Sequence, residues 1–246
     1  MLFFKNRYLC SMANPYFRFK QFTIWHDKCA MKVGTDGVLL GAWSHVGGAK
    51  TILDVGCGSG LIALMLAQRC DASVDAIDID EGAFLQTQFN VEQSPFANRI
   101  KAHHSPLETY ANSCDTRYDL IVSNPPFFRH SLRSPDGQRT LARHSDTLPT
   151  NSLLADSLRL LTPTGRIALI LPTDNGEELV AQAHSLQLHP QRITHVHPTP
   201  QSASKRLLIE LSPQKPQTME TKDLIIEEAR HSYTEAFRRL TKDFYL

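Results

Sequence analysis

Four residues in one short segment have the types and spacing of a ligand-binding loop. In ILDVGCGSG, Asp54 precedes Gly56, Gly58 and Gly60, between an apolar stretch that predicts a strand and another that predicts a helix. Glycine permits positive φ and has no Cβ, so a ligand can lie against the backbone where the strand ends. The Asp54 carboxylate disfavours a pyrophosphate and favours a cationic group, such as the ammonium of an amino-acid moiety. Glycines in a tight strand–helix turn can also serve packing alone.

A second acid, Asp78, ends the next predicted strand, SVDAID. A carboxylate at this place can accept hydrogen bonds from two ribose hydroxyls, as it does in dinucleotide sites. Strand, loop, helix, second strand and terminal acid in this order favour a nucleotide-type ligand over a purely structural turn. An NAD dehydrogenase is expected to show G-x-G-x-x-G, but Leu61 holds the place of the third glycine. Together with Asp54, that substitution argues against NAD.

The segment Asn124-Pro125-Pro126-Phe127 stands where the predicted strand YDLIVSN stops. The prolines end the strand and fix its backbone. The Asn124 side-chain oxygen and the Pro125 carbonyl can accept both N–H bonds of a planar –NH2 group, which stabilises the positive charge that develops as its nitrogen attacks an electrophile. Phe127 can stack on a planar substrate such as a base. The segment alone could be a strand terminator, but its position after a ligand-binding loop favours a role at a planar nitrogen.

Basic side chains cluster directly after this segment. Arg129, Arg133, Arg139 and Arg143 lie there with Asp136 as the only acid among them. One interpretation is a solvated charged loop. Because the cluster is adjacent to the reacting segment, contact with RNA phosphates is favoured.

The elements that must position these residues alternate between strand and helix from Thr51 onward. Such alternation predicts the α/β class, with a mostly parallel sheet and helices on both faces. The predicted strands Arg192–His197 and Arg206–Leu211 have no helix between them, so they must be antiparallel. Upstream, YFRFKQFTIW predicts one or two short strands, and Thr35 or Asp36 can cap a following helix.

Composition narrows the class further. The chain has 246 residues, 41% of them hydrophobic, and 26 basic against 25 acidic side chains give a net charge of +1. This excludes a charge-driven disordered chain and requires any polyanion site to be local. No apolar run is long enough to span a bilayer, and no secretory signal is expected. The five scattered cysteines predict free thiols in a reducing cytoplasm, and the histidines show no metal-ligand spacing.

The motif D-V-G-C-G-S-G with the downstream A-I-D-I-D resembles the S-adenosylmethionine site of the Rossmann-like class I methyltransferases. The Asn-Pro-Pro-Phe segment resembles the signature of methyltransferases that modify exocyclic or amide nitrogens. The flanking segments FRFKQFTIWHDKCAMKVGTDGVLLGAW, SPDGQRTLARHSDTL and YTEAFRRLTKDFYL resemble the family of bacterial tRNA1(Val) adenine N6-methyltransferases, so that the resemblance covers nearly the whole chain.

This resemblance implies a seven-stranded, mostly parallel sheet whose last strand is antiparallel. It implies S-adenosylmethionine as cofactor and an adenine beside the anticodon of a valine tRNA, position 37, as substrate. Asn124, Pro125, Pro126 and Phe127 would form the catalytic segment. The cofactor residues it implies are Lys32, Thr35, Asp54, Gly56, Gly58, Gly60, Asp78, Ile79, Ser105 and Asn124. Ser105 stands where class I enzymes often carry an acid that recognises the cofactor adenine.

Several alternatives remain open at this point. Another planar nitrogen, guanine N2 of rRNA or a release-factor glutamine, would suit the same segment, and a non-catalytic cofactor-binding RNA protein is a further alternative. We expect an N-terminal extension over the cofactor site (1–48), a methyltransferase core (49–213) and a C-terminal segment packed on the same domain (214–246). We also expect a cytoplasmic monomer with tRNA as partner and with no obligate protein partner, membrane or metal.

Overall fold

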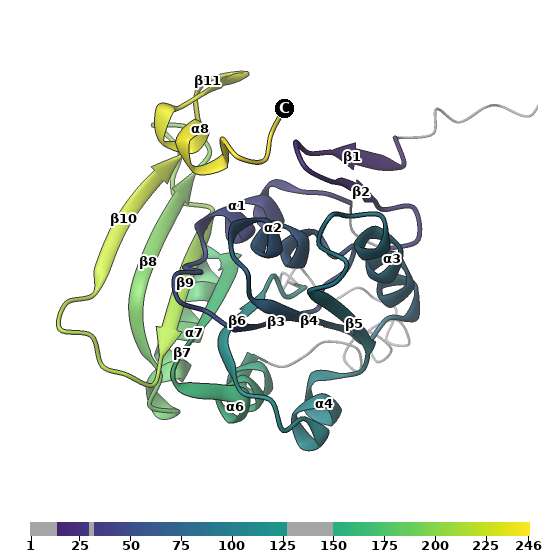
Figure 1. Cartoon of the computed structure of the whole chain (residues 1–246). Coiled ribbons are helices and arrows are strands. Elements are labelled where there is room, and N and C mark those ends of the chain that lie inside the picture. The colour runs from purple at the N-terminus through teal and green to yellow at the C-terminus, as the bar shows by residue number, and fades with distance from the viewer. Residues whose placement is uncertain (1–13, 30–31, 127–149) are drawn as a thin grey trace, which may run out of the picture.

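A computed structural model describes residues 14–29, 32–126 and 150–246, and its centre is one eight-stranded sheet (Figure 1). In spatial order its strands are β10 (Glu220–Ile225), β8 (His189–His197), β9 (Arg206–Ser212), β7 (Leu161–Pro172), β6 (Tyr118–Ser123), β3 (Thr51–Val55), β4 (Ser73–Asp78) and β5 (Ile100–His104). All neighbours are parallel except β9, which is antiparallel to both β7 and β8. The prediction of a mostly parallel sheet with an antiparallel strand is confirmed.

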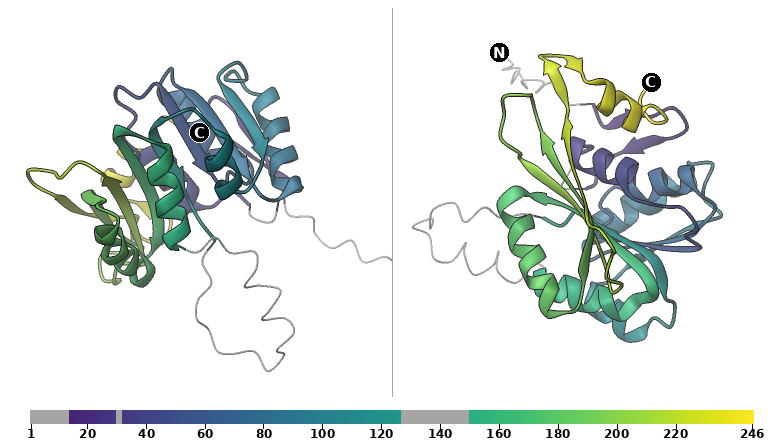
Figure 2. Two further views of the ribbon diagram at one scale, coloured as in Figure 1. Left: turned by 90° about the horizontal axis from the view of Figure 1, so that it is seen from below. Right: turned by 90° about the vertical axis from the view of Figure 1, so that its left-hand side faces the viewer.

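Helices cover both faces of the sheet (Figures 1 and 2). One face carries α1 (Thr35–Trp43), α2 (Leu61–Arg69), α3 (Glu81–Glu92) and α8 (Glu235–Thr241), and the other carries α4 (Leu107–Ser113), α6 (Thr150–Leu160) and α7 (Thr173–Ser185). The sheet separates two apolar clusters, and neighbouring residues of one strand supply opposite clusters: Ile52 belongs to the first and Leu53 to the second. This two-sided burial explains why the central strands are nearly continuous apolar runs.

The sheet has eight strands and not the seven that the resemblance implied. The additional strand, β10, pairs in parallel with β8 from Glu220↔Arg192 to Ile225↔His197. Only Leu224 of β10 is buried, because the strand lies at the sheet edge with most of its side chains in solvent. Its sequence, ETKDLI, therefore lacks the apolar run that is typical of the central strands of the sheet.

Two short hairpins complete the described chain: β1 (Tyr16–Arg18) with β2 (Thr23–Trp25), and β11 (Glu227–Ala229) with β12 (Ser232–Tyr233). The first lies near the start of α1 and the second precedes α8 (Figure 1). No helix among these described residues is long and apolar enough to cross a membrane.

The start of α1 corrects one expectation. The N-cap is Gly34, in an extended conformation, and neither Thr35 nor Asp36 caps the helix with its side chain. Asp36 instead pairs with Arg206, at 2.7 Å from Oδ2 to Nε. Arg206 lies opposite Pro172, the last residue of β7. This ion pair fixes the start of α1 at the edge where the parallel strands end, called here the carboxyl edge.

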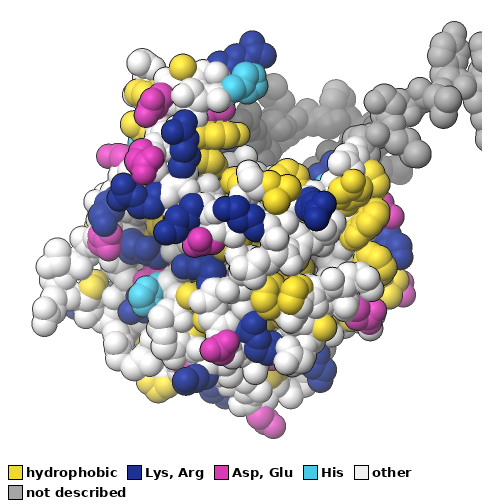
Figure 3. Space-filling view, turned by 45° about the horizontal axis from the view of Figure 1, so that its top comes forward, with side chains coloured by type: hydrophobic (Ala, Val, Ile, Leu, Met, Phe, Trp, Pro, Cys, Tyr) yellow, Lys and Arg dark blue, Asp and Glu magenta, His cyan; other side chains and the backbone are white. Residues whose placement is uncertain are grey.

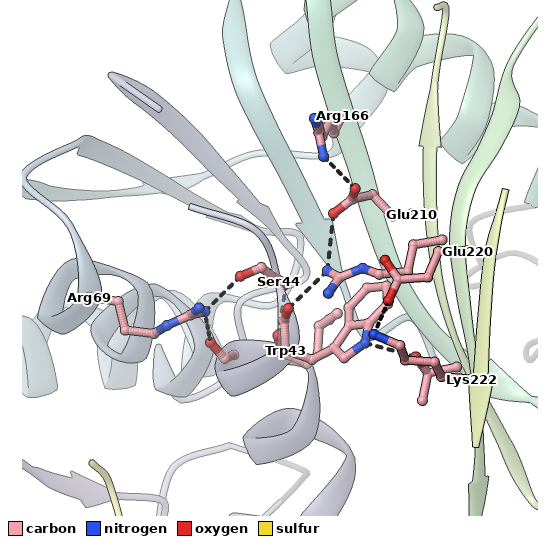
Figure 4. Close-up of polar contacts among 11 residues, drawn as sticks. Trp43, Ser44, Arg69, Arg166, Glu210, Glu220 and Lys222 are labelled. Atoms are coloured by element: carbon pink, nitrogen blue, oxygen red, sulfur yellow. Dashed lines mark hydrogen bonds and ion pairs between the residues drawn. The ribbon is translucent and has the colours of Figure 1, made fainter. Parts of the chain in front are cut away.

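A buried acid fixes the other end of α1 (Figure 4). Glu210 of β9 is 1% exposed, and its carboxylate lies 2.7 Å from Arg166 and 3.3 Å from Arg192. The Arg192 guanidinium lies 3.7 Å from the ring centroid of Trp43, the last residue of α1, and also donates to its carbonyl. In these four residues, the Glu210 cluster, two guanidinium groups compensate the buried carboxylate, and Arg192 attaches α1 to the sheet through Trp43.

Candidate active site

Strand register brings the predicted site residues into one row at the carboxyl edge. Ser123 of β6 lies opposite Val55 of β3, and Val55 lies opposite Ile77 of β4. The next residues along these strands are Asn124, Gly56 and Asp78. Because adjacent strands are about 4.8 Å apart, the Asn124-Pro125-Pro126 segment (the acceptor segment, after its predicted role), the glycine loop and Asp78 are neighbours.

The glycine loop has the backbone that its sequence predicted. Gly56, Gly58 and Gly60 adopt positive φ values of 72°, 58° and 78°. A Cβ on Gly56 or Gly58 would meet no heavy atom within 4 Å, so open space lies over both. At Gly60 a Cβ would come within 3.0 Å of Thr87. The first two glycines leave room for a ligand against the backbone, and the third permits close packing on α3.

Backbone hydrogen bonds wrap this loop around the end of β4. The amides of Gly56 and Cys57 both donate to the Ile77 carbonyl, at 2.9 and 3.0 Å. The Gly58 amide donates to Oδ2 of Asp78 at 2.8 Å. Asp78 therefore shapes the loop in addition to its predicted ribose contact. Each carboxylate oxygen has a second lone pair, so the hydrogen bonds within the protein leave acceptor capacity for ligand hydroxyls.

Asp54 is a fully buried carboxyl group with one free oxygen. Its Oδ2 accepts from the Ala63 amide at 3.0 Å, whereas Oδ1 has no hydrogen-bond partner in the part of the chain that the structure describes. Burial, reinforced by the nearby charge of Asp78, raises the pKa of Asp54 to about 7. A cationic ligand group would stabilise the ionised form. This unsatisfied oxygen beside an open glycine backbone fits the ammonium-bearing end of S-adenosylmethionine.

Residues after β4 and β5 provide a second part of the site. Ile79, directly after Asp78, is 60% exposed, which gives an apolar surface beside that carboxylate. The Ser105 amide donates to the Asp78 carbonyl, and its hydroxyl donates to the Pro106 carbonyl at 3.1 Å. The structure thus places Ser105 next to Asp78, with its hydroxyl proton directed at the backbone of the following residue.

A hydrogen bond connects the strand before the acceptor segment, β6, to the strand before the glycine loop, β3. The Ser123 hydroxyl donates to the Val55 carbonyl at 2.8 Å, which locks the ends of β6 and β3 together. Asn124 and Pro125 are half-buried and Pro126 is exposed. The backbone from which Asn124 projects is therefore fixed while the segment itself opens toward solvent, as a site for a large substrate requires.

Lys32 and Thr35 are both exposed; Thr35 opens α1 at the carboxyl edge. The remaining predicted site residues, Phe127, Arg129, Arg133, Arg139 and Arg143, lie outside the described residues. Their catalytic and RNA-binding roles stay predictions.

Two polar side chains of α3 that sequence reasoning did not select hold the loop from behind. Thr87 donates from its hydroxyl to the Gly58 carbonyl at 3.0 Å. The Asn90 amide group donates to the carbonyls of Ser59 and Trp25, and its oxygen accepts from the Trp25 amide. Both side chains are fully buried. Two polar residues three positions apart in a helix, hence on one face, were the available signal.

The fold has the architecture of class I methyltransferases. The structure is similar to a predicted O-methyltransferase from Agrobacterium tumefaciens, with a TM-score of 0.66 and 17% identity, covering 85% of this chain and 96% of that one. It is also similar to the ribosomal protein L11 methylase from Lactobacillus delbrueckii subsp. bulgaricus, with a TM-score of 0.51 and 17% identity, covering 73% and 77%. These likenesses confirm the predicted fold class.

Sequence relatives define the family more narrowly. Residues 34–183 match the methyltransferase small domain model. The chain is 56% identical over 235 residues to the "tRNA1(Val) (adenine(37)-N6)-methyltransferase" of Parabacteroides distasonis, covering 96% of this chain and 99% of that protein, and 47% identical to the Bacteroides fragilis protein of that name, with the same coverage. The chain belongs to the tRNA1(Val) (adenine(37)-N6)-methyltransferase family. The predicted family, enzyme class and cofactor, S-adenosylmethionine, are thereby confirmed.

Proposed function

We propose that this protein methylates N6 of the adenine at position 37 of tRNA1(Val). The observation that carries the proposal is the row formed by Asn124, Gly56 and Asp78 at the carboxyl edge. This row supports a site in which the predicted acceptors, Asn124 and Pro125, lie next to the cofactor loop. Relatives of nearly the same length, 47–56% identical, carry this activity in their names.

S-adenosylmethionine, when bound, supplies an electrophilic methyl group. Asp54 would hold its cationic amino-acid end, Gly56 and Gly58 would let it lie against the backbone, and Asp78 would accept from its ribose hydroxyls. The positive-φ glycines with open space above them and the free oxygen of Asp54 support this assignment. Ile79 would pack on its flat base.

Asn124 and Pro125 would act on the substrate nitrogen. The exocyclic amino group of adenine is a poor nucleophile because its lone pair is delocalised into the ring. The Asn124 side-chain oxygen and the Pro125 carbonyl would accept its two N–H bonds, favour a pyramidal nitrogen and stabilise the positive charge that grows during transfer. A strong base is unnecessary, because the nitrogen can lose its proton after the transfer.

The substrate must present its base out of the stack. Pro126 is exposed and Asn124 half-buried, so a base has to enter from solvent. An unpaired anticodon-loop purine can be splayed out at modest energetic cost. The predicted stacking by Phe127 and phosphate contacts by Arg129, Arg133, Arg139 and Arg143 belong to this proposal, as does action in the cytoplasm, where tRNA is modified.

The test is incubation of the full chain with methyl-labelled cofactor and total tRNA from a strain that lacks the activity, followed by nucleoside analysis. Label in N6-methyladenosine supports the proposal. Label in a methylguanosine, or in a release factor added to a parallel reaction, would replace it with one of the rival substrates. The Asn124→Ala variant is the control for contaminating methyltransferases.

A further inference from the structure

A groove lies where the N-terminal hairpin, the start of α1 and the C-terminal helix α8 meet. Its volume is about 660 Å³, and its lining includes Phe17, Lys20, Tyr233, Arg238, Lys242 and Tyr245. Figure 3 shows hydrophobic and basic side chains intermixed on the face that carries these elements. Of the residues that line the groove, only Thr35, at the start of α1, was predicted to contact the cofactor, so the groove needs a separate explanation.

Two aromatic rings of the groove are exposed and rigidly supported. Phe17 is 37% exposed and Tyr233 is 44% exposed. The Phe17 ring packs against Phe19 at 4.8 Å and against Tyr245 at 6.0 Å between centroids. The Tyr233 ring stacks on Phe237 at 4.9 Å. Rings held in place by inner rings but open to solvent can stack on a planar ligand with little loss of conformational entropy.

Three cations line the same groove. Lys20, Arg238 and Lys242 are exposed, and none of them forms an ion pair with any of the residues that the structure describes. Among the described residues, the Lys20 ammonium donates only to the Lys242 carbonyl, at 2.5 Å. By contrast, Arg239, also on α8 but not part of the groove lining, pairs with Glu235. The charge in the groove is therefore available to an anionic partner.

The groove is continuous with the carboxyl edge. Gly34 and Thr35 line it, and the next residue, Asp36, pairs with Arg206 opposite the end of β7. The end of β7 lies at the same edge as Asn124, because β7 and β6 are parallel neighbours. An RNA strand that presents its base to Asn124 can therefore continue past the start of α1 toward α8.

We propose that this groove binds the single-stranded nucleotides flanking the methylated base, with bases on Phe17 and Tyr233 and phosphates on Lys20, Arg238 and Lys242. The inference rests on the proposed function and deepens it by assigning a second RNA contact. Exposed rings interleaved with unpaired cations match the requirements of single-stranded nucleic acid, in which every base has a π-face and every linkage a negative charge.

The first test removes the charges. A variant with Lys20→Gln, Arg238→Gln and Lys242→Gln is compared with a matched variant carrying Lys101→Gln, Lys215→Gln and Arg239→Gln, exposed cations outside the groove. Single-stranded phosphate contacts contribute about 0.7 each to the slope of log K against log salt, so the groove variant should lose about 2 from the slope for tRNA binding. Its KM for tRNA should rise by roughly tenfold or more, with cofactor affinity unchanged. The matched variant should keep both values.

The second test removes the rings. Phe17→Leu and Tyr233→Leu keep apolar bulk but cannot stack, and Tyr16→Leu is the matched control, since Tyr16 is 39% exposed but rests on Trp25 and does not line the groove. Each groove substitution should weaken RNA binding by roughly 5- to 150-fold, the range for losing one stacked base, with the salt slope unchanged. The control should bind like the unchanged chain.

The outcomes separate the two proposals. If the unchanged chain methylates tRNA while the groove variants keep its salt slope, affinity and KM, the groove inference is wrong and the proposed function stands. If the unchanged chain methylates no tRNA, the proposed function is wrong, and the groove inference that rests on it is wrong as well. Loss of binding to anionic lipid vesicles without loss of RNA binding would assign the groove to a membrane and overturn the inference.

Discussion

Two buried carboxyl groups of this protein, Glu210 and Asp54, differ in whether the protein supplies them with cationic partners. Glu210 is 1% exposed and lies within hydrogen-bonding distance of two guanidinium groups, those of Arg166 and Arg192. Asp54 is 0% exposed, accepts one backbone hydrogen bond and has a free oxygen in the described structure. The first carboxylate is satisfied by the fold, whereas the second lacks a cation.

This difference indicates that Glu210 has a structural role and that Asp54 has a ligand-binding role. A buried charge that the protein itself neutralises holds elements together, here α1 against β7, β8 and β9. A buried carboxyl group without a cation costs stability, and its raised pKa is the physical sign of that cost. The open glycine backbone beside Asp54 is where an external cation can compensate. This assignment of roles would be wrong if substitution of Glu210 changed ligand binding, or if substitution of Asp54 changed only stability.

The largest expected effect is on stability at the Glu210 cluster. Glu210→Ala leaves two guanidinium groups without their buried partner, and we expect a loss of roughly 3–5 kcal/mol in the free energy of unfolding, measured by chemical denaturation. Glu210→Gln keeps hydrogen-bond acceptance and should lose less. Cofactor affinity of the folded fraction should not change; a weaker affinity would show that the cluster is coupled to the site.

The next effect is on catalysis. Asn124→Ala removes one acceptor of the charge-developing amino group, so kcat should fall by roughly 10²–10³-fold. Calorimetric titration should find cofactor binding nearly intact, and thermal unfolding should match the unchanged chain. Equal losses of kcat and cofactor affinity would contradict a role centred on the substrate nitrogen.

Asp54 should make the ligand-free protein sensitive to pH. Its pKa is about 7 when folded and near 3.8 when unfolded, so between these values the folded state binds the extra proton. The free energy of unfolding should therefore fall as pH rises from about 4 to 7, by an amount on the order of 3 kcal/mol relative to Asp54→Asn. Denaturation curves of both proteins across this range measure the difference. Parallel pH profiles would refute the raised pKa.

The smallest of these expected effects is the loss of cofactor affinity on substitution of Asp78. Asp78→Ala removes the acceptor of the Gly58 amide as well as the predicted ribose contact. We expect cofactor affinity to fall by roughly 10–100-fold, the equivalent of one hydrogen bond to a charged group. Asp80→Ala is the matched control, since Asp80 caps α3 through the Ala83 amide instead. Unchanged affinity in Asp78→Ala would remove this residue from the site.

The sequence predicted the parts of the fold that have strong local signals. The strand TILDV is a continuous apolar run because both its faces are buried, and the N-cap of α3 is Asp80, a residue type that is typical of N-caps. Strand β10 and helix α4 had no such signal: β10 buries one residue, and LETYANS buries two. Elements with so few buried side chains depend on tertiary neighbours, which a local pattern does not contain.

The candidate site likewise has features that local sequence predicts and features that depend on tertiary packing. The glycine positions followed from local backbone chemistry, since only glycine readily adopts φ values near 60–80°. The support by Thr87 and Asn90 depends on how α3 packs behind the loop, about thirty residues further along the chain. The free oxygen of Asp54 and the groove beside α8 likewise depend on three-dimensional placement.

The most direct measurement of the central claim uses two tRNA1(Val) transcripts that differ only at position 37. The full chain is incubated with methyl-labelled S-adenosylmethionine and each transcript, and the digested nucleosides are separated. We predict one N6-methyladenosine per molecule of the transcript with adenine at position 37, and none when guanine replaces it. Equal labelling of both transcripts, or label in any other nucleoside, would contradict the account.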